Sequence, residues 1–259
     1  MRRFSAEYLR ETRRGMWEDS REALSPLELS RRNRILDVGC GEGALTRVLA
    51  EATKAAVIGC DREPDLLSKL DLPAVRGDAL TLPFVDSSFD LVVCQALLIN
   101  LPDPVDAIEE FARVSSETVG CIEPDNADVS IDSTVDAEAR LAARARRRYL
   151  RGVETDVSLG TDLGDLLREA GLADVRVERY DFERTVEPPY HPASIRTVSR
   201  TASGAGLRDR RETMAGTDEE LDALRSAWRS MGRDAIEQIE RGEYRRREVV
   251  PFYVGVGEI

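Results

Sequence analysis

The chain has 259 residues, of which 42% are hydrophobic, and its 49 acidic and 37 basic side chains give a formal net charge of −12. This length suffices for one large α/β domain with elaborations or for two small ones, and the apolar content supplies a real core and excludes global disorder. No apolar run approaches the roughly 20 residues that cross a bilayer, and an acidic chain repels a phosphate backbone on average. We therefore expect neither a membrane nor a nucleic-acid partner.

The first residues, "MRRFSAEYLRETRRG", lack the apolar segment of a signal peptide, which predicts a cytoplasmic protein. Acidic residues are frequent and lysine is almost absent, as in proteins of salt-loving organisms. Four cysteines, none in C-x-x-C spacing, accompany a single histidine, His191. This pattern argues against a metal site and against disulfides, and we expect the cysteines to be small buried apolar residues.

Residues 1–32 are predicted to form a helical cap with helices at 5–17 and 20–30. Short apolar strands then alternate with amphipathic helices, which predicts right-handed β-α-β units and a parallel sheet. The expected strands are 33–38, 56–61, 73–76, 90–95 and 118–123, and the expected helices are 43–52, 64–70 and 104–114.

After residue 123 the pattern changes. An Arg-rich helix at 133–151, a helix at 161–171 and an alternating strand at 172–182 are followed by a segment with three prolines and a long helix at 217–241. We interpret 1–259 as a single domain, with a core at 33–183, a helical lid at 184–247 and a final strand at 248–259.

The stretch "ILDVGCGEG" (35–43) places Gly39, Gly41 and Gly43 directly after the first strand of this core. Ligands of open α/β sheets lie at the carboxyl ends of the strands, and glycines there permit positive φ and close approach of a ligand. The pattern alone is compatible with a nicotinamide dinucleotide and with S-adenosylmethionine.

Several residues bear on this choice. Asp37 would repel a diphosphate by roughly 4 kcal/mol per unit charge at about 4 Å and an effective dielectric near 20, whereas it attracts a sulfonium and an amino group. The spacing G-x-G-x-G also differs from the dinucleotide pattern G-x-G-x-x-G. Asp61 ends the second strand, where a carboxylate accepts ribose hydroxyls of either ligand, and the neighbouring Arg62 is compatible with NADP.

A second stretch, "GDALTLPFVDSSFDLVVCQ" (77–95), follows the third strand. Together with "ILDVGCGEG" it resembles the class I S-adenosylmethionine-dependent methyltransferases, especially those of the methyltransferase-11 type. The resemblance continues through "LINLPDPVDAIEEFARV" and "TDLGDLLREAGLADVRVERYDF" and covers about 33–183 and the last strand. It implies a Rossmann-like, seven-stranded, mostly parallel sheet with helices on both faces, an antiparallel last strand and a helical lid.

The resemblance also implies a set of cofactor-binding residues. The glycine turn, with Cys40 inside it, would frame the methionine end, which Asp37 helps to orient. Asp61 would accept the ribose hydroxyls, Arg62 and Asp78 would lie at the adenine, and Gln95 would lie near the sulfonium. The full set is Asp37, Gly39, Cys40, Gly41, Gly43, Asp61, Arg62, Asp78, Ala79, Gln95 and Leu97.

The chain departs from the family at two places. "RVSSETVG" lacks the Pro-Gly-Gly turn that usually precedes the fifth strand, and Asn100 stands near a position where relatives often have histidine. The segment "EPPY" (187–190) resembles a signature of amino-group methyltransferases, but that signature belongs at the end of the fourth strand, where this chain has "QALL". We interpret "EPPY" as a chance match.

No catalytic residue is defined by the sequence. Glu123 and Asp125 follow the fifth strand and are candidate bases, but either can instead cap the next loop. Histidine is the side chain suited to proton transfer near neutral pH, and His191 lies in the expected lid, where it is equally a plain surface residue.

Two helical faces in the last third of the sequence have alternative interpretations. Arginines at 140, 144, 147, 148 and 151 share one face, which predicts a solvated face paired with carboxylates or, alternatively, a surface for an anionic substrate or partner. The apolar stripe of the long helix is expected to be lid core rather than a pocket wall; it consists of Leu221, Leu224, Trp228, Met231 and Ala235.

The expected function is the transfer of a methyl group from S-adenosylmethionine to a small organic acceptor by in-line displacement. An alternative is a cofactor-binding protein of the same fold that is non-catalytic or regulatory, and a nicotinamide oxidoreductase is the third hypothesis. We expect a monomer or a homodimer.

Overall fold

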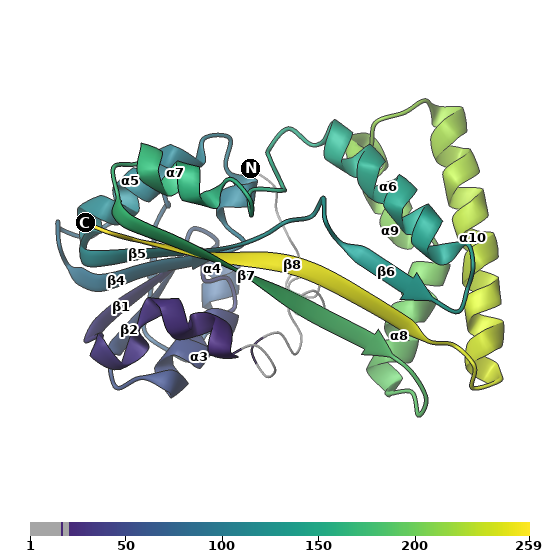
Figure 1. Cartoon of the computed structure of the whole chain (residues 1–259), viewed down its shortest axis with the longest axis horizontal. Helices are drawn as coiled ribbons and strands as arrows, with labels where there is room; N and C mark the ends of the chain where they lie inside the picture. The colour runs from purple at the N-terminus through teal and green to yellow at the C-terminus, as the bar shows by residue number, and fades with distance from the viewer. Residues whose placement is uncertain (1–16, 18–20) are drawn as a thin grey trace. The chain divides into compact units, whose positions relative to one another are not determined.

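The computed structural model of the chain describes residues 17 and 21–259, which form two compact units (Figure 1). The sheet unit contains the described residues up to Asp125, together with Ser158–Tyr180 and Phe252–Ile259. The helical unit contains Asn126–Val157 and Asp181–Pro251. The chain passes between the units several times, and two strands have residues in both.

The sheet unit is built on parallel strands in the order β3-β2-β1-β4-β5. Ile35 in the central strand pairs with Val57 on one side and with Leu91 on the other, so the apolar runs predicted from the sequence lie side by side. β8 (Arg246–Glu258) follows β5 and runs antiparallel to it, as expected of the last strand, and β7 (Ala173–Val186) pairs with β8. The parallel strands are β1 (Arg34–Val38), β2 (Ala56–Asp61), β3 (Ala74–Arg76), β4 (Phe89–Gln95) and β5 (Ser115–Pro124).

Helices cover both faces of this sheet, with α5 and α7 on one face and α3 on the other (Figure 1). α5 (Pro104–Val114) begins with proline, whose fixed φ suits the first turn, and it buries Ala107, Ile108, Phe111 and Val114 at helical spacing. The remaining helices of the unit are α3 (Ala44–Ala52), α4 (Pro64–Leu67), η3 (Leu98–Asn100) and α7 (Leu163–Glu169).

The N-terminal cap differs from its prediction. The helix expected at 20–30 is instead two 3₁₀ segments, η1 (Arg21–Leu27) and η2 (Leu29–Arg31). Pro26 interrupts regular helical hydrogen bonding, and Glu28 between the two segments has a left-handed backbone with φ 49°. The helix expected at 5–17 lies outside the described residues except for Trp17.

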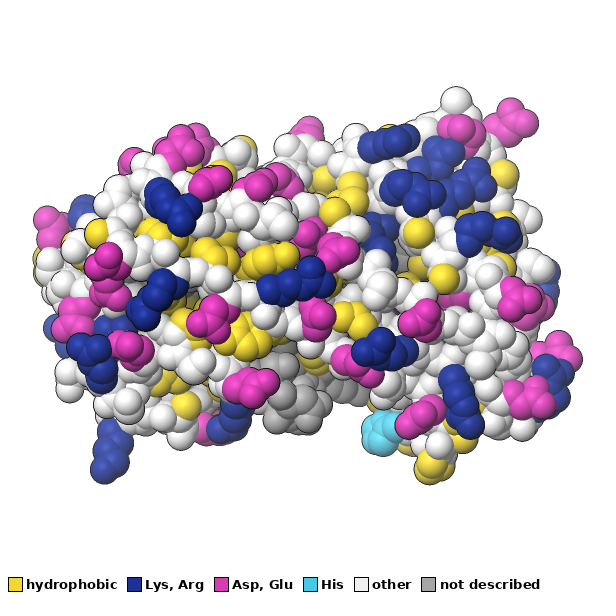
Figure 2. Space-filling model, in the orientation of Figure 1, with side chains coloured by type: hydrophobic (Ala, Val, Ile, Leu, Met, Phe, Trp, Pro, Cys, Tyr) yellow, Lys and Arg dark blue, Asp and Glu magenta, His cyan; other side chains and the backbone are white. Residues whose placement is uncertain are grey.

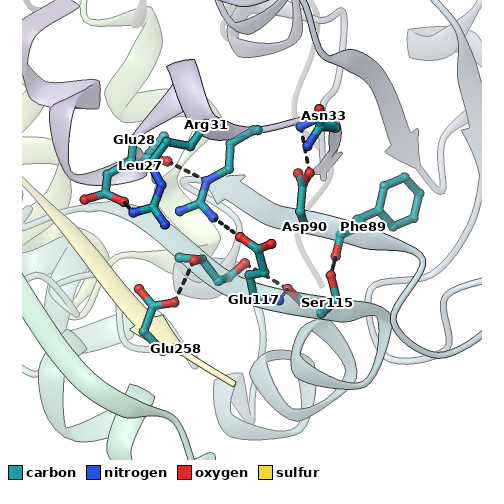
Figure 3. A network of polar contacts seen from close by, with 12 residues as sticks. Leu27, Glu28, Arg31, Asn33, Phe89, Asp90, Ser115, Glu117 and Glu258 are labelled. Carbon is teal, nitrogen blue, oxygen red and sulfur yellow. Dashed lines mark hydrogen bonds and ion pairs between the residues drawn. The ribbon is translucent and has the colours of Figure 1, made fainter.

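A polar network fixes the N-terminal segments against the edge of the sheet where β1 begins (Figure 3). Arg32 is buried, and it donates to the Leu27 carbonyl oxygen and to Glu117 Oε2, both at 3.0 Å. The carboxylate of Asp90 accepts the backbone N–H of Asn33 at 2.6 Å. These contacts hold the start of β1 beside β4 and β5, so that the opposite, carboxyl end of β1 has a defined position.

The helical unit contains α6 (Glu138–Gly152), α8 (Pro192–Ala202), α9 (Ala205–Asp209), η4 (Arg211–Thr213) and α10 (Asp218–Glu240). Its core contains Leu221, Leu224, Met231 and Ala235, with Trp228 partly buried against it, so the predicted stripe lies in the core of the helical unit. α6 contributes Leu141 and Ala145 to the same core. Residues 126–157, which we expected with the core at 33–183, therefore pack with the helices of the expected lid.

The described residues contain eight strands where seven were expected. The additional strand, β6 (Ser130–Ser133), pairs antiparallel with β8 from Ser130↔Val249 to Ser133↔Arg246. Its sequence, "SIDS", is too short and polar to show a strand pattern, and the pairing with the long β8 makes it a strand.

Candidate cofactor-binding site

The glycine turn joins β1 to α3 and depends on left-handed backbone geometry. Gly39, Gly41 and Gly43 have φ values of 69°, 58° and 82°, which other residues rarely adopt. The N–H groups of Gly39 and Cys40 donate to the Cys60 carbonyl oxygen at 2.7 and 3.1 Å. The turn is thereby bound to the end of β2.

Leucine side chains also pack closely against the glycines of this turn. A Cβ added at Gly39 would lie 2.9 Å from Leu97 Cδ1, and one added at Gly43 would lie 2.1 Å from Leu70 Cδ1. Leu97 belongs to the loop after β4, so the turn after β1 and the loop after β4 are in contact at the carboxyl edge of the sheet.

Asp61 lies beside the glycine turn. Its Oδ2 accepts the Gly41 N–H and its Oδ1 accepts the Glu63 N–H, both at 2.9 Å. The side chain is only partly buried. A carboxylate has about four acceptor positions, so the two oxygens retain capacity for further donors.

Asp37 has a different environment. It is buried, and its Oδ2 accepts the Thr46 hydroxyl at 2.6 Å, which connects β1 to the first turn of α3. This contact joins the end of β1 to the start of α3 on either side of the glycine turn.

The predicted adenine-side residues follow β2 and β3, which are neighbours in the sheet. Arg62 is partly exposed, with its Nε 3.5 Å from Glu63 Oε1. Asp78 is exposed and accepts the Leu80 N–H at 3.1 Å, whereas Ala79 is buried. The Gly77 N–H donates to the Asp61 carbonyl oxygen at 3.2 Å, which joins this loop to the end of β2.

Gln95 ends β4 and is buried. Its Oε1 accepts the Trp17 indole N–H at 3.4 Å, and the Trp17 ring meets Phe252 edge-on with centroids 6.2 Å apart. Trp17 is the last residue of the helix expected at 5–17. No local signal connects it to Gln95, because the two residues are 78 positions apart.

Glu123 is fully buried and faces the loop after β4. Its Oε1 accepts the N–H groups of Leu97 and Leu98 at 2.9 and 2.8 Å, so it caps the N-terminus of η3. The carboxylate therefore orders the segment that contacts Gly39. Asp125, two residues later, is also buried.

His191 lies in the helical unit and is exposed. Its Nδ1 accepts the Ala193 N–H at 3.2 Å, and it forms the N-cap of α8. This contact gives His191 a local structural function.

Asn100, the last residue of η3, carries an unusual buried oxygen. Its Nδ2 donates to the Ala96 carbonyl oxygen at 2.9 Å. Its Oδ1 is buried and accepts no hydrogen bond from any residue that the structure describes. A buried acceptor of this kind calls for a donor.

The four cysteines are free and buried, as expected. The Sγ atoms of Cys40 and Cys60 fill the space above Gly59 and Gly77, each 2.8 Å from where a Cβ would lie. Burial raises the pKa of the Cys60 thiol to about 12 and that of Cys40 further.

Within residues 17 and 21–259, no group of side chains is arranged to hold a metal ion, and no helix is long and apolar enough to span a membrane.

Comparison with known proteins identifies the sheet unit. Residues 36–118 match the family described as the methyltransferase domain. The demethylmenaquinone methyltransferases of Shouchella clausii and Lactiplantibacillus plantarum are 25% and 28% identical, and each alignment covers 62% of this chain and 79% of the relative. The relative from Mycobacterium sp. (strain KMS) is 39% identical over 98 residues, which cover 37% of this chain and 42% of that one.

Solved structures show the same fold. A Bacillus halodurans protein assigned by inference as a methyltransferase superposes with a TM-score of 0.54 at 18% identity, over 93% of this chain and 98% of that one. A chain from the Haloferax volcanii complex of the Trm112 methyltransferase activator with an inferred methyltransferase gives 0.50 at 22% identity, over 67% and 74%. The chain therefore contains a methyltransferase domain at residues 36–118, and its α/β fold is that of the class I S-adenosylmethionine-dependent methyltransferases.

Proposed function

We propose that this methyltransferase transfers the methyl group to a small organic acceptor, with the cofactor bound across the glycine turn and Asp61. The observation that supports this most is the Asp61 carboxylate, which the Gly41 N–H holds at 2.9 Å beside the turn while its oxygens keep acceptor capacity. Ribose hydroxyls are donors that suit such a carboxylate.

The residues present fit the cofactor. Gly39 and Gly41 leave the backbone of the turn without side chains, so a ligand can approach it closely. We place the methionine end at this turn with Cys40 and Gly43, and with the negative charge of Asp37 behind it. Arg62, Asp78 and Ala79 would surround the adenine, and Gln95 and Leu97 would lie nearest the sulfonium.

The bound cofactor supplies an electrophilic methyl group, and the chain must align the acceptor with it. In-line displacement requires the acceptor atom about 3–3.5 Å from the methyl carbon, with water excluded. Glu123 contributes by fixing the backbone of Leu97 and Leu98, and we propose that the free Oδ1 of Asn100 accepts a hydrogen bond from the acceptor. Neither residue is required as a base in this scheme.

The relatives suggest which acceptor to test first. The two demethylmenaquinone methyltransferases that align over 79% of their length act, by their names, on a demethylated quinone. A quinol-type compound is therefore the first acceptor to try, followed by a panel of small phenols, amines and carboxylates.

The cofactor site is tested by calorimetric titration of the full chain with S-adenosylmethionine and S-adenosylhomocysteine. We expect Asp61→Ala to weaken binding by roughly ten- to a hundredfold, the equivalent of about 1.5–3 kcal/mol for hydrogen bonds to a charged group. Asp61→Asn, which keeps one acceptor oxygen, should lose less. Asp106→Asn, an exposed acid on α5, changes the net charge equally and should bind like wild type.

Because Asp61 also accepts two backbone N–H groups, thermal unfolding of each variant must accompany the titration. A folded Asp61→Ala variant that binds as well as wild type would disprove the placement of the ribose. Cofactor binding without turnover across the acceptor panel would instead favour the non-catalytic or regulatory alternative.

A further inference from the structure

α10 carries an open hollow of about 370 Å³ that the cofactor site does not explain. Five side chains of this helix line it: Asp222, Arg225, Ser226, Arg229 and Arg233. They recur at intervals of three and four residues, so they lie on one helical face. Three of the five are arginines, and like charges four residues apart disfavour a helix unless counter-charges offset them.

The sequence offers acids at helical spacing to two of these arginines, but the fold uses those acids elsewhere. Asp222, three residues before Arg225, pairs with Arg211 at 2.7 Å. Glu237, four residues after Arg233, pairs with Arg241 at 2.6 Å. Among the residues that the structure describes, none forms an ion pair with Arg225, Arg229 or Arg233.

Two contacts give the hollow a defined geometry. The Cγ atoms of Arg225 and Arg229 both lie 3.5 Å from where a Cβ of Gly204 would be, so their stems pass over the turn between α8 and α9. The Nε of Arg225 is buried and has no hydrogen-bond acceptor. A buried donor without a partner calls for an acceptor from outside the protein.

The local charge supports an anionic occupant. The helical unit has 20 acidic and 19 basic residues, whereas the rest of the chain has 29 and 18, so the net charge of −12 lies almost entirely outside the helical unit. Arg211 pairs with both Asp218 and Asp222, and the side chains that line the hollow carry three positive charges against the one negative charge of Asp222. An anion therefore meets attraction here despite the acidic chain.

We propose that the hollow on α10 binds a phosphate-bearing compound with at least two negative charges, through Arg225, Arg229 and Arg233. A guanidinium presents a planar set of donors that matches phosphate oxygens two at a time. At a rise of 1.5 Å per residue, the Cα atoms of Arg225 and Arg233 are about 12 Å apart, and long side chains from that span can converge on a diphosphate. This site is independent of methyl transfer.

α6 offers a matched control surface in the same unit. Figure 2 shows basic side chains gathered over this helix. Arg148 pairs with Glu220 at 3.1 Å, but the expected pairing of this face with carboxylates does not extend to Arg140, Arg144 and Arg147, which have no ion pair among the described residues. Replacing these three removes the same charge as replacing the three arginines of the hollow.

The test is calorimetric titration of the full chain with inorganic pyrophosphate, at low salt and with saturating S-adenosylhomocysteine. The triple variant Arg225→Gln, Arg229→Gln, Arg233→Gln is compared with Arg140→Gln, Arg144→Gln, Arg147→Gln. We expect one site in wild type, a loss of at least about tenfold in the hollow variant, and near-wild-type binding in the control. Glutamine is a good helix former, and circular dichroism verifies that α10 persists.

Trp228 provides a second readout, because its ring lies beside the same Gly204 turn and its indole N–H donates to the Thr201 carbonyl oxygen at 2.6 Å. In a Trp17→Phe background it is the one remaining tryptophan, and its fluorescence should change with pyrophosphate unless the hollow is mutated.

Co-sedimentation with phosphatidylcholine vesicles containing phosphatidic acid distinguishes the two sources of the phosphate group. Vesicle binding through these arginines assigns a lipid headgroup, and pyrophosphate binding alone assigns a free compound. Equal weakening in both triple variants, or no binding of either probe in wild type, would overturn the proposal.

Discussion

At the residue scale, the side chains predicted to bind the cofactor differ in how they are held. Asp61 is partly exposed beside the glycine turn, whereas Asp37 is buried and accepts the Thr46 hydroxyl. Glu123 was a candidate base from its position after the fifth strand, yet its carboxylate faces backbone N–H groups of Leu97 and Leu98. A residue's place after a strand can be predicted from sequence, but its hydrogen-bond partners depend on distant loops.

The cysteines allow a prediction at this scale. All four are buried, and burial raises the pKa of Cys60 to about 12, so thiolate is scarce at neutral pH. We expect iodoacetamide to leave the native protein unmodified for hours at pH 7.5 and to label four thiols in urea. Mass spectrometry provides the count, and rapid labelling of Cys40 or Cys60 in the native protein would contradict the packing around the glycine turn.

At the scale of elements, α8 and α10 pack through Gly232. A Cβ there would lie 2.4 Å from the Ala202 Cα, and that neighbour is backbone and cannot rotate away. Glycine lowers the helix propensity of α10 by about 1 kcal/mol relative to alanine, so its presence reflects this contact between two helices.

We therefore expect Gly232→Ala to destabilise the protein by about 1–3 kcal/mol, because overpacking forces the helices apart. Gly206 in α9 is the matched control, since nothing lies within 4 Å of its Cβ position. There the same substitution should stabilise by roughly 0.4–1 kcal/mol through the unfolded chain. Urea unfolding of both variants measures the difference, and a neutral Gly232→Ala would argue against close packing of α8 on α10.

The start of α10 gives a pH-dependent prediction. The hydrogen bond from Arg148, followed by the Thr217 backbone N–H of the capping box, lowers the pKa of Glu220 to about 2 from an ordinary 4.5. A lowered folded-state pKa means that its stabilisation is present above pH 4.5 and is lost as the pH falls through about 2. Glu220→Gln should thus flatten the dependence of the urea midpoint between these values.

Glu219→Gln is the control for Glu220, because Glu219 is exposed in the same helical turn and its side chain forms no hydrogen bond or ion pair with a described residue. If both variants follow the wild-type pH dependence, the capping box and the Arg148 contact do not stabilise α10.

At the scale of the whole molecule, the net charge of the chain is an average over two units that differ in charge. The helical unit is close to neutral, and the rest of the chain carries nearly all of the net negative charge. The expectation that an acidic chain avoids phosphate follows from the average, whereas the hollow on α10 depends on local charge. Because salt largely screens interactions between exposed charges beyond about a Debye length, roughly 10 Å at moderate salt, a ligand at the hollow responds to nearby charges more than to the total.

The sequence by itself determined the parallel sheet, because buried strands and amphipathic helices impose periodicities that are visible locally. The strand at 56–61 and the helix at 104–114 agree with the structure to the residue, and the glycine turn and Asp61 follow from strand ends. Only the tertiary structure decided the features that join distant segments. β6 exists because β8 extends far enough to pair with it, and α6 joins the helical unit because Leu141 and Ala145 find their apolar partners there. Likewise Asp222 and Glu237 lie at helical spacing from Arg225 and Arg233, but they pair with Arg211 and Arg241 instead. Ion pairs form between side chains that the fold brings together, whatever their spacing along a helix.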